Sequence, residues 1–323
     1  MMRRVLIAIL VGVIGGAGFA WHRYGPMNGP SRPPSADQWE ALMRQRIKVP
    51  HGYKFEIFAK NLDSPRLLQM TASGDLVVSG YRTNNLILLK RDSDGDGHSD
   101  QQIVLKENMR LPHGLLLEGG TLFVAEEKRV LKYDFDGTAL TNERVVLDNL
   151  PVDGNHTSRT IARGPDGFLY LSIGSSCNSC IEDNPWRAAI LRFREGEVPE
   201  IYASGLRNTV GFDWQPGIGA LFGVDNGRDN LGDDVPDDEV NHIERGQHYG
   251  WPFVHGYNVR DPSLYPKKPA ALMTVLPVHG LGAHVAPLSI VFLRHQADGK
   301  LNGTALVAEH GSWMHNRKCQ WCL

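Results

Sequence analysis

The chain has 323 residues, with 34 lysines and arginines against 36 aspartates and glutamates and a formal net charge of −2. Charged residues make up 22% and hydrophobic residues 41%, which excludes a disordered or fibrous chain. No basic stripe stands out, so we expect no nucleic-acid partner. The length fits two average domains, or one large domain of the barrel or propeller kind.

Residues 1–20 are typical of a targeting segment. Two arginines, Arg3 and Arg4, precede an uncharged apolar run over residues 5–20, which is short for a membrane-spanning helix of about 20 residues. The run ends on small residues and predicts a cleaved secretory signal, with an uncleaved membrane anchor as the alternative. Either places the rest of the chain outside the cytoplasm, in the periplasm or secreted, and touching a membrane only through such an anchor.

Residues 21–49 begin as a linker rich in proline and glycine. A capping-box pattern at Ser35 then predicts a short helix to about Arg46.

From residue 50 onward, short apolar runs recur, each introduced by a glycine. The copies are 74–79, 120–125, 167–172, 219–224 and 303–308. The first four follow one another at intervals of 46, 47 and 52 residues, and a propeller blade takes about 40–50. We expect each copy to be an inner strand buried on both faces. The alternative is a β-sandwich with coincidental spacing.

This spacing predicts an all-β propeller domain over residues 50–313, with four blades and the start of a fifth. Residues 314–323 change character abruptly, and we interpret them as an atypical tail at a truncated or frame-shifted end. Arg66 and His113 stand where expected strands begin. Packing at a strand end is our interpretation for both, and facing the channel is the alternative.

Two sequence stretches offer polar groups to a ligand. His156 lies in a loop just before an expected inner strand, and its ordinary pKa near neutrality suits a general base. Arg207 and Asn208, between two glycines, offer a forked donor and an amide to a planar oxyanion. The alternatives are a loop histidine bonded to backbone and an arginine paired with a carboxylate.

Residues 225–239 gather carboxylates and glycines. Carboxylates, backbone carbonyls and water are the ligands that Ca²⁺ takes, and glycines let carbonyls turn toward an ion. A solvated acidic loop is the alternative.

Taken together, these motifs resemble a known family. His-Thr-Ser-Arg, Gly-Leu-Arg-Asn, Asp-Asn-Gly-Arg-Asp, Asp-Asp-Glu-Val-Asn and Tyr-Gly-Trp-Pro occur in this order between residues 156 and 252. The order resembles the pyrroloquinoline-quinone (PQQ)-dependent glucose/sorbosone dehydrogenase family over roughly residues 50–313.

The resemblance implies a six-bladed propeller with PQQ and Ca²⁺ on its axis, the last blade being incomplete in this chain. His156 matches the family's general base, and Arg207 and Asn208 match residues that hold the quinone oxygens. The implied calcium site consists of the backbone carbonyls of Gly227 and Arg228, with Asp237, Asp238 and Tyr249 supporting the ion through water.

The chain departs from the family pattern at two positions. Gly311 stands where some members supply a lysine to the quinone, and His284 stands where one branch has a small hydroxyl residue.

An aspartate-rich stretch predicts a possible second calcium loop. The oxygen-bearing residues stand at alternate positions and are Asp92, Asp94, Asp96 and Asp100. The twelfth position is Ile103 instead of glutamate, so the stretch is not a complete EF-hand. A turn tightened by Ca²⁺ and a plain Asp/Gly turn both fit.

Cys177 and Cys180 are separated by two residues and are not followed by the histidine of a c-type haem site. In an oxidising compartment we expect a local disulfide, and a redox role is the alternative.

We therefore interpret the chain as a periplasmic PQQ-dependent dehydrogenase. It would oxidise a sugar, a sorbosone-like sugar aldehyde or a related alcohol by His-assisted hydride transfer, and pass the electrons to an acceptor that the sequence does not name. The alternatives are a calcium-dependent lactonase or other hydrolase on a propeller, and a binding propeller without catalysis.

Overall fold

The computed structural model describes residues 40–312, apart from 42, 46, 50, 53, 295–298 and 300. The expected signal or anchor, most of the linker and the tail at 314–323 lie outside this range. Residues 40, 41 and 43–45 are helical and belong to the short helix expected before the propeller.

Within the described residues, four antiparallel sheets have four strands each, one two-stranded pair lies in an insertion, and a second pair follows the fourth sheet. The first sheet holds β1 (Pro65–Met70), β2 (Leu76–Gly80), β3 (Asn85–Leu89) and β4 (Gln102–Lys106). The second holds β5 (Gly114–Glu118), β6 (Thr121–Ala125), β7 (Val130–Phe135) and β8 (Leu140–Leu147). The third holds β9 (Arg159–Arg163), β10 (Leu169–Ile173), β11 (Ala189–Phe193) and β12 (Glu200–Ser204).

The fourth sheet closes with a strand that returns after an insertion. It holds β13 (Thr209–Trp214), β14 (Leu221–Asp225), β15 (Asp237–Ile243) and β18 (His279–Ala283). The insertion contains β16 (Val254–His255), β17 (Val259–Arg260) and the short 3-10 helix η1 (Tyr265–Lys267). The last pair is β19 (Pro287–Phe292) with β20 (Ala305–Glu309).

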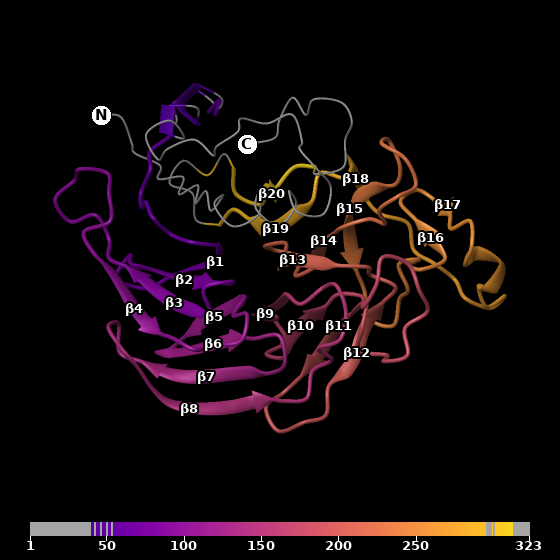
Figure 1. Ribbon diagram of the computed structural model, residues 1–323, viewed down its shortest axis with the longest axis horizontal. Coiled ribbons are helices and arrows are strands. Elements are labelled where there is room, and N and C mark those ends of the chain that lie inside the picture. The colour runs from indigo at the N-terminus through magenta and orange to yellow at the C-terminus, as the bar shows by residue number, and fades with distance from the viewer. Residues whose placement is uncertain are drawn as a thin grey trace, which may run out of the picture.

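The sheets stand around a common centre like the blades of a propeller (Figure 1). Strands β1, β5, β9, β13 and β19 contact their neighbours from blade to blade near that centre, while β4, β8 and β12 lie outside. The expected all-β propeller is confirmed, with four complete blades and two strands of a next one among the described residues. The six blades of the family resemblance are not shown by these strands.

The first four recurring apolar runs are inner strands of their sheets, as expected, although none is the strand nearest the centre. The runs form β2, β6, β10, β14 and β20, each the second strand counted from the centre or, for β20, the partner of β19. Strands β2 and β10 are buried at every residue, because both of their faces are covered. The neighbouring blades cover β10, whereas the second blade covers one face of β2 and Phe58 and Leu62 cover the other. The strand before each run faces the centre. Strand β20 is mostly exposed.

The core lies between the blades. Leu122 and Val124 of the second blade pack with Val77 and Leu88 of the first. Phe123, on the opposite face of β6, packs in a separate cluster with third-blade residues. Alternate residues of one strand therefore bind the blade to its two neighbours, because successive side chains point to opposite faces.

The antiparallel order sets where loops can meet. The start of each innermost strand lies beside the end of the second strand at the same edge of the sheet. The loops before β9, β13 and β19 and the loops after β10 and β14 therefore reach one rim of the centre.

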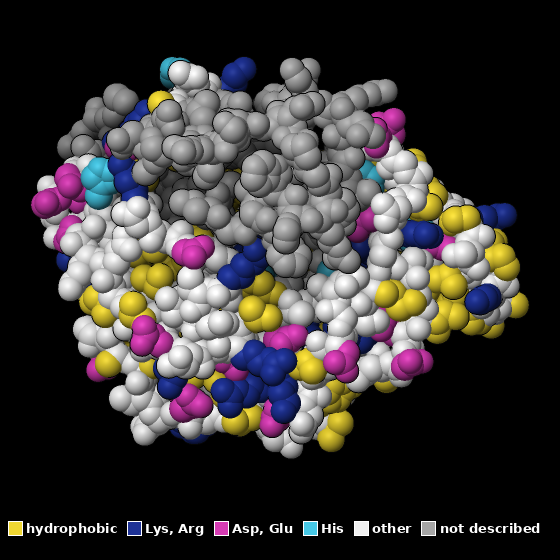
Figure 2. Space-filling view, in the orientation of Figure 1, with side chains coloured by type: hydrophobic (Ala, Val, Ile, Leu, Met, Phe, Trp, Pro, Cys, Tyr) yellow, Lys and Arg dark blue, Asp and Glu magenta, His cyan; other side chains and the backbone are white. Residues whose placement is uncertain are grey.

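Figure 2 shows acidic and basic side chains interspersed over the described part of one face. Among the described residues, no helix has the length and apolar character that a membrane span requires.

Candidate functional site

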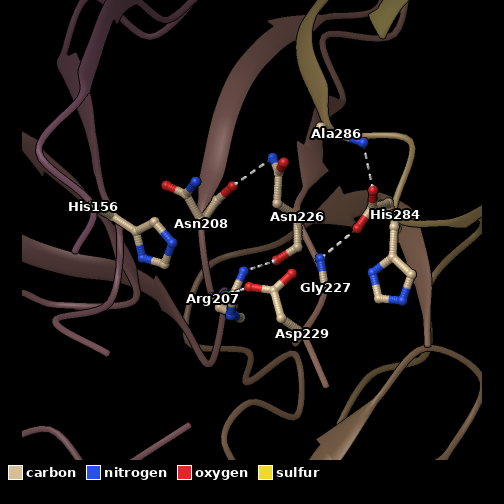
Figure 3. Close-up of a pocket in the computed structure, with 9 residues that line it drawn as sticks. His156, Arg207, Asn208, Asn226, Gly227, Asp229, His284 and Ala286 are labelled. Carbon is tan, nitrogen blue, oxygen red and sulfur yellow. Dashed lines mark hydrogen bonds and ion pairs between the residues drawn. The ribbon is translucent and has the colours of Figure 1, made fainter. Parts of the chain in front are cut away.

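A cavity of about 130 Å³ opens at this rim (Figure 3). Its walls come from the loops before β9, β13 and β19 and after β14. The lining residues are His156, Arg207, Asn208, Asn226, Gly227, Asp229, Asp238, His284 and Ala286. The structure thus brings together His156, Arg207, Asn208, Gly227 and Asp238 from the sequence analysis.

A larger cavity of about 430 Å³ adjoins the first, and His156 and Asn208 line both. Its other lining residues are Arg66, Tyr81, Arg82, Leu111, His113, Asn155, Thr157, Ser158, Val210 and Leu288. The smaller space suits an ion and its ligands, whereas the larger one falls in the range of small-molecule sites, about 300–1,000 Å³.

His156 presents one ring nitrogen to these cavities. Its Nδ1 lies 2.9 Å from the carbonyl oxygen of Ser175, so Nδ1 carries the proton and Nε2 keeps its lone pair. Burial, and then the charge of Arg207, lower the pKa of His156 to about 3. The imidazole is therefore neutral and able to accept a proton at Nε2.

Gly174 allows His156 and Asn208 to approach each other. A Cβ at this position would lie 2.5 Å from Asn208 Oδ1 and 2.6 Å from the Cβ of His156, closer than atoms can pack. Asn208 Oδ1 is buried and has no hydrogen-bond partner among the described residues. An unpaired buried oxygen is costly, which indicates that this amide is built to meet a ligand.

Arg207 is almost fully buried, with 5% of its surface exposed. Its Nε donates to the carbonyl of Asn178 at 3.0 Å and its Nη2 donates to Asn178 Oδ1 at 3.0 Å. The same Nη2 pairs with Asp229 Oδ2 at 3.0 Å, and Nη1 donates to the carbonyl of Asn226 at 3.1 Å. The guanidinium plane is therefore fixed before any ligand enters.

Asn178 belongs to the loop that the Cys177–Cys180 disulfide closes. Besides holding Arg207, it pairs with the backbone of Asp229 in both directions: Oδ1 accepts from the N–H at 2.9 Å and Nδ2 donates to the carbonyl at 3.0 Å. The disulfide loop thereby links the third blade to the acidic loop after β14.

Asp225 holds the turn that carries Arg207 and Asn208. Its carboxylate accepts the backbone N–H of Arg207 and of Asn208, each at 2.9 Å, and the hydroxyl of Thr209 at 2.8 Å. Burial raises the pKa of Asp225 to about 7, while these three donors favour the charged form.

Asp238 performs a similar role on the other wall of the cavity. It accepts the N–H of Gly227 at 2.6 Å and of Ala286 at 2.8 Å, which ties the loop after β14 to the loop before β19. Burial raises the pKa of Asp238. Asn226 adds a second tie through Nδ2, which donates to the carbonyl of Pro287 at 2.9 Å.

Three residues of the expected calcium shell are not among those lining the cavity. The side chain of Arg228 turns away to Asp261. Asp237 stands next to Gly280 on the neighbouring strand β18. Tyr249 lies in the core between blades, where its hydroxyl donates to the carbonyl of His242 at 2.7 Å and accepts the N–H of Glu244 at 2.8 Å. Ligation by the Arg228 carbonyl stays a prediction.

Sequence reasoning missed several site residues. Arg66 and His113, interpreted as packing at strand ends, line the larger cavity. Their position at the start of an innermost strand, shared with His156 and Asn208, was the available signal. Asn178 gave no signal, because only the folded chain brings it to Arg207.

The possible second calcium loop forms a tight exposed turn. Oxygens of Asp92, Asp94 and Asp100 lie within 4.8 Å of one another, and Asp96 is not part of this cluster. Asp92 accepts the N–H groups of Gly95, at 2.6 Å, and Gly97, at 2.9 Å. The turn is held by its own backbone, and ion binding there stays a prediction.

The main site fits the cofactors expected from the sequence. Carbonyl and carboxylate oxygens at Gly227, Asp229 and Asp238 are the donors a hard cation requires. A guanidinium and the unpaired amide of Asn208 suit the oxygens of a quinone. Fold and site together define a β-propeller whose central polar cavity carries the ligands of a cation and, beside them, the hydrogen-bond donors that an anionic cofactor needs.

A model of the TrAA12-like family matches residues 47–268 of the chain, more than half of its length. The chain therefore belongs to the TrAA12-like family. Its homologues include PQQ-dependent sugar oxidoreductases, and the resemblance drawn from the sequence is confirmed.

Three relatives illustrate the likeness. A PQQ-dependent sugar dehydrogenase of Hypocrea jecorina is 24% identical, over 62% of this chain and 55% of that protein. The holo form of the pyranose dehydrogenase PQQ domain of Coprinopsis cinerea is 20% identical with a TM-score of 0.69, covering 83% of this chain and 76% of that one. A calcium structure of the Trichoderma reesei family AA12 enzyme is 22% identical with a TM-score of 0.66, covering 80% and 76%. The expected cofactors, PQQ and calcium, are supported by these relatives.

Proposed function

We propose that this protein is a PQQ- and calcium-dependent dehydrogenase that oxidises a hydroxyl or hydrated aldehyde carbon of a sugar, or a related alcohol. The observation that carries the proposal is the position of His156. A neutral imidazole, hydrogen-bonded at Nδ1 and open at Nε2, lines both cavities beside a fixed guanidinium.

Cofactor binding falls to the residues around the smaller cavity. Arg207 and Asn208 would hold the quinone oxygens, and oxygens of the Gly227 loop would hold Ca²⁺ with Asp238 keeping that loop in place. When bound, PQQ polarised by Ca²⁺ supplies the acceptor for a hydride.

His156 would remove the proton of the substrate hydroxyl as the neighbouring C–H is broken. Ser175 fixes the orientation of the ring by accepting from Nδ1, so Nε2 faces the substrate. The low pKa of His156 reflects the burial and positive charge around it. Negative charge brought by a tricarboxylate cofactor raises it toward a useful range for a base.

The same proposal places the protein outside the cytoplasm. The basic and apolar residues 1–20 support export. The Cys177–Cys180 disulfide also supports it, because disulfides persist in oxidising compartments. An unidentified carrier would take the electrons.

Reconstitution tests the proposal. Protein supplied with Ca²⁺ and PQQ should reduce an artificial dye when aldoses are added, and His156→Gln should lose at least about 100-fold in rate while binding PQQ normally. His279→Gln, at an exposed histidine of β18, is the matched control and should keep full activity. Hydrolysis of lactones without quinone-dependent dye reduction by any sugar or alcohol would overturn the proposal in favour of a calcium-dependent hydrolase.

A further inference from the structure

We propose that the larger cavity is a binding subsite for a carboxylate, with Arg66 as its main contact and Arg82 as a second positive charge. The carboxylate belongs either to the quinone cofactor or to an acidic sugar, such as a uronate. The assignment to a source rests on the function proposed above, whereas carboxylate binding itself does not.

The first argument is the charge of the lining. Two arginines face a space of about 430 Å³, and its lining within the described residues includes neither aspartate nor glutamate. The remaining polar groups are hydroxyls, amides and imidazoles. Such a wall attracts an anion, because the low dielectric of a cavity strengthens the field of a positive charge.

The second argument is the contrast between Arg66 and the other arginines of this region. Arg207 pairs with Asp229, and Arg228 pairs with Asp261. Arg66 has no carboxylate partner among the described residues. Its Cζ lies 5.4 Å from the centre of the Tyr81 ring, a cation–π contact that leaves the donors of the guanidinium available.

Tyr81 is itself held in place. Its hydroxyl is hydrogen-bonded to Thr157, and its ring meets the ring of His113 edge to face with centroids 5.9 Å apart. Arg66 therefore rests on a fixed aromatic platform, which reduces the conformational entropy lost when a ligand binds.

The imidazole of His113 leaves the net positive charge of this lining unchanged. Burial, and then the charge of Arg66, lower the pKa of His113 to about 3, so this imidazole is neutral. Burial and the charge of Arg82 likewise lower the pKa of Arg66, although a guanidinium stays protonated. Like charges therefore crowd the cavity, and a bound carboxylate would relieve their repulsion.

The position of the subsite links it to the reaction. His156 lines the same cavity, so a ligand anchored by its carboxylate at Arg66 has the rest of its body beside the proposed base. A carboxylate of the cofactor would anchor the end remote from Arg207. A carboxylate of the substrate would instead make the enzyme prefer acidic over neutral sugars.

The test compares Arg66→Gln, Arg66→Lys and a matched control, Arg245→Gln, which removes an exposed arginine that pairs with Glu200. In the full-length protein with Ca²⁺, PQQ affinity is measured by quenching of tryptophan fluorescence. Affinities for D-glucuronate and D-glucose are then measured by calorimetry on the PQQ-loaded protein.

Loss of a charged hydrogen bond should weaken binding about 10- to 100-fold. If Arg66→Gln weakens PQQ that much, and Arg66→Lys restores part of it, the cofactor is the source. If PQQ is unaffected but the preference for glucuronate over glucose is lost, the substrate is the source.

Arg66→Gln that binds both PQQ and glucuronate like the wild type, or loses no more than Arg245→Gln, would overturn the inference. Folding is checked by the melting temperature, and Arg66→Lys supplies the answer if the glutamine variant is unstable. Glucuronate binding that depends on Arg66 without any dye reduction would refute the proposed dehydrogenase and leave the subsite standing.

Discussion

Replacing Asp225 should disrupt the cofactor site indirectly, by releasing the turn that carries Arg207 and Asn208. The carboxylate touches neither cavity but holds the turn at Arg207, Asn208 and Thr209 through three hydrogen bonds of 2.8–2.9 Å. Asp225→Ala leaves two backbone N–H groups and a hydroxyl without their partner in a buried place. Each such group costs about 1–3 kcal/mol, partly offset because a buried charge also disappears, so we expect a loss of about 3–5 kcal/mol.

Asp225→Asn removes the negative charge of the side chain but keeps its shape and one of its two acceptor oxygens. The amide oxygen can still accept from Asn208 and Thr209, while the NH₂ group must face the N–H of Arg207. We expect a smaller loss of about 1–2 kcal/mol in the free energy of unfolding.

Thermal unfolding and PQQ titration measure both effects. At about 2–4 °C per kcal/mol for a chain of this size, Asp225→Ala should lower the melting temperature by about 10 °C and Asp225→Asn by less than half of that. PQQ affinity should fall at least about tenfold in the alanine variant, because Arg207 and Asn208 lose their fixed position.

Asp134→Asn is the matched control. Asp134 is exposed on β7 and pairs with Arg144 at the surface, so its loss should cost under about 1 kcal/mol. An alanine variant at position 225 that melts and binds PQQ like the wild type would refute the reasoning. Equal losses in the asparagine and alanine variants would show that the charge matters and the hydrogen-bond geometry does not.

Two further predictions concern the surroundings of the site. Asn178→Ala removes the side-chain contacts to Arg207 and Asp229, so PQQ affinity should drop about tenfold with a small change in melting temperature; unchanged affinity in a fluorescence titration would contradict this. His113 has a pKa lowered to about 3 in the folded state, so the unfolded chain binds a proton below about pH 6.5 that the folded chain does not. Stability should therefore be lost as pH falls from 6.5 toward 3, by about 2 kcal/mol at pH 5 from this residue; denaturant titrations of His113→Gln should show a shallower pH dependence than the wild type, and an equally steep one would contradict the assignment.

The recurring apolar runs determined the architecture from sequence alone. A strand covered on both faces is apolar at every position, and repetition of such runs at blade-like intervals predicts stacked four-stranded sheets. The pattern did not tell which strand of the blade it marked. Burial on both faces belongs to the second strand, because the first strand turns one edge toward the central cavities.

The order of motifs likewise located His156, Arg207 and Gly227, since each stands at an end of an expected strand and such ends meet at one rim. Tyr249 stood in the same series of motifs, but its ring fills the core between blades.

Tertiary structure alone decided the partners of these residues. Asn178 lies 29 residues from Arg207 and 51 from Asp229, and Asp238 lies 48 residues from Ala286. Local sequence records how a residue is buried and which turn it makes, because those depend on its neighbours along the chain. Which side chain pairs with which across blades depends on the rotation of one sheet against the next, and that is fixed only when the whole core has packed.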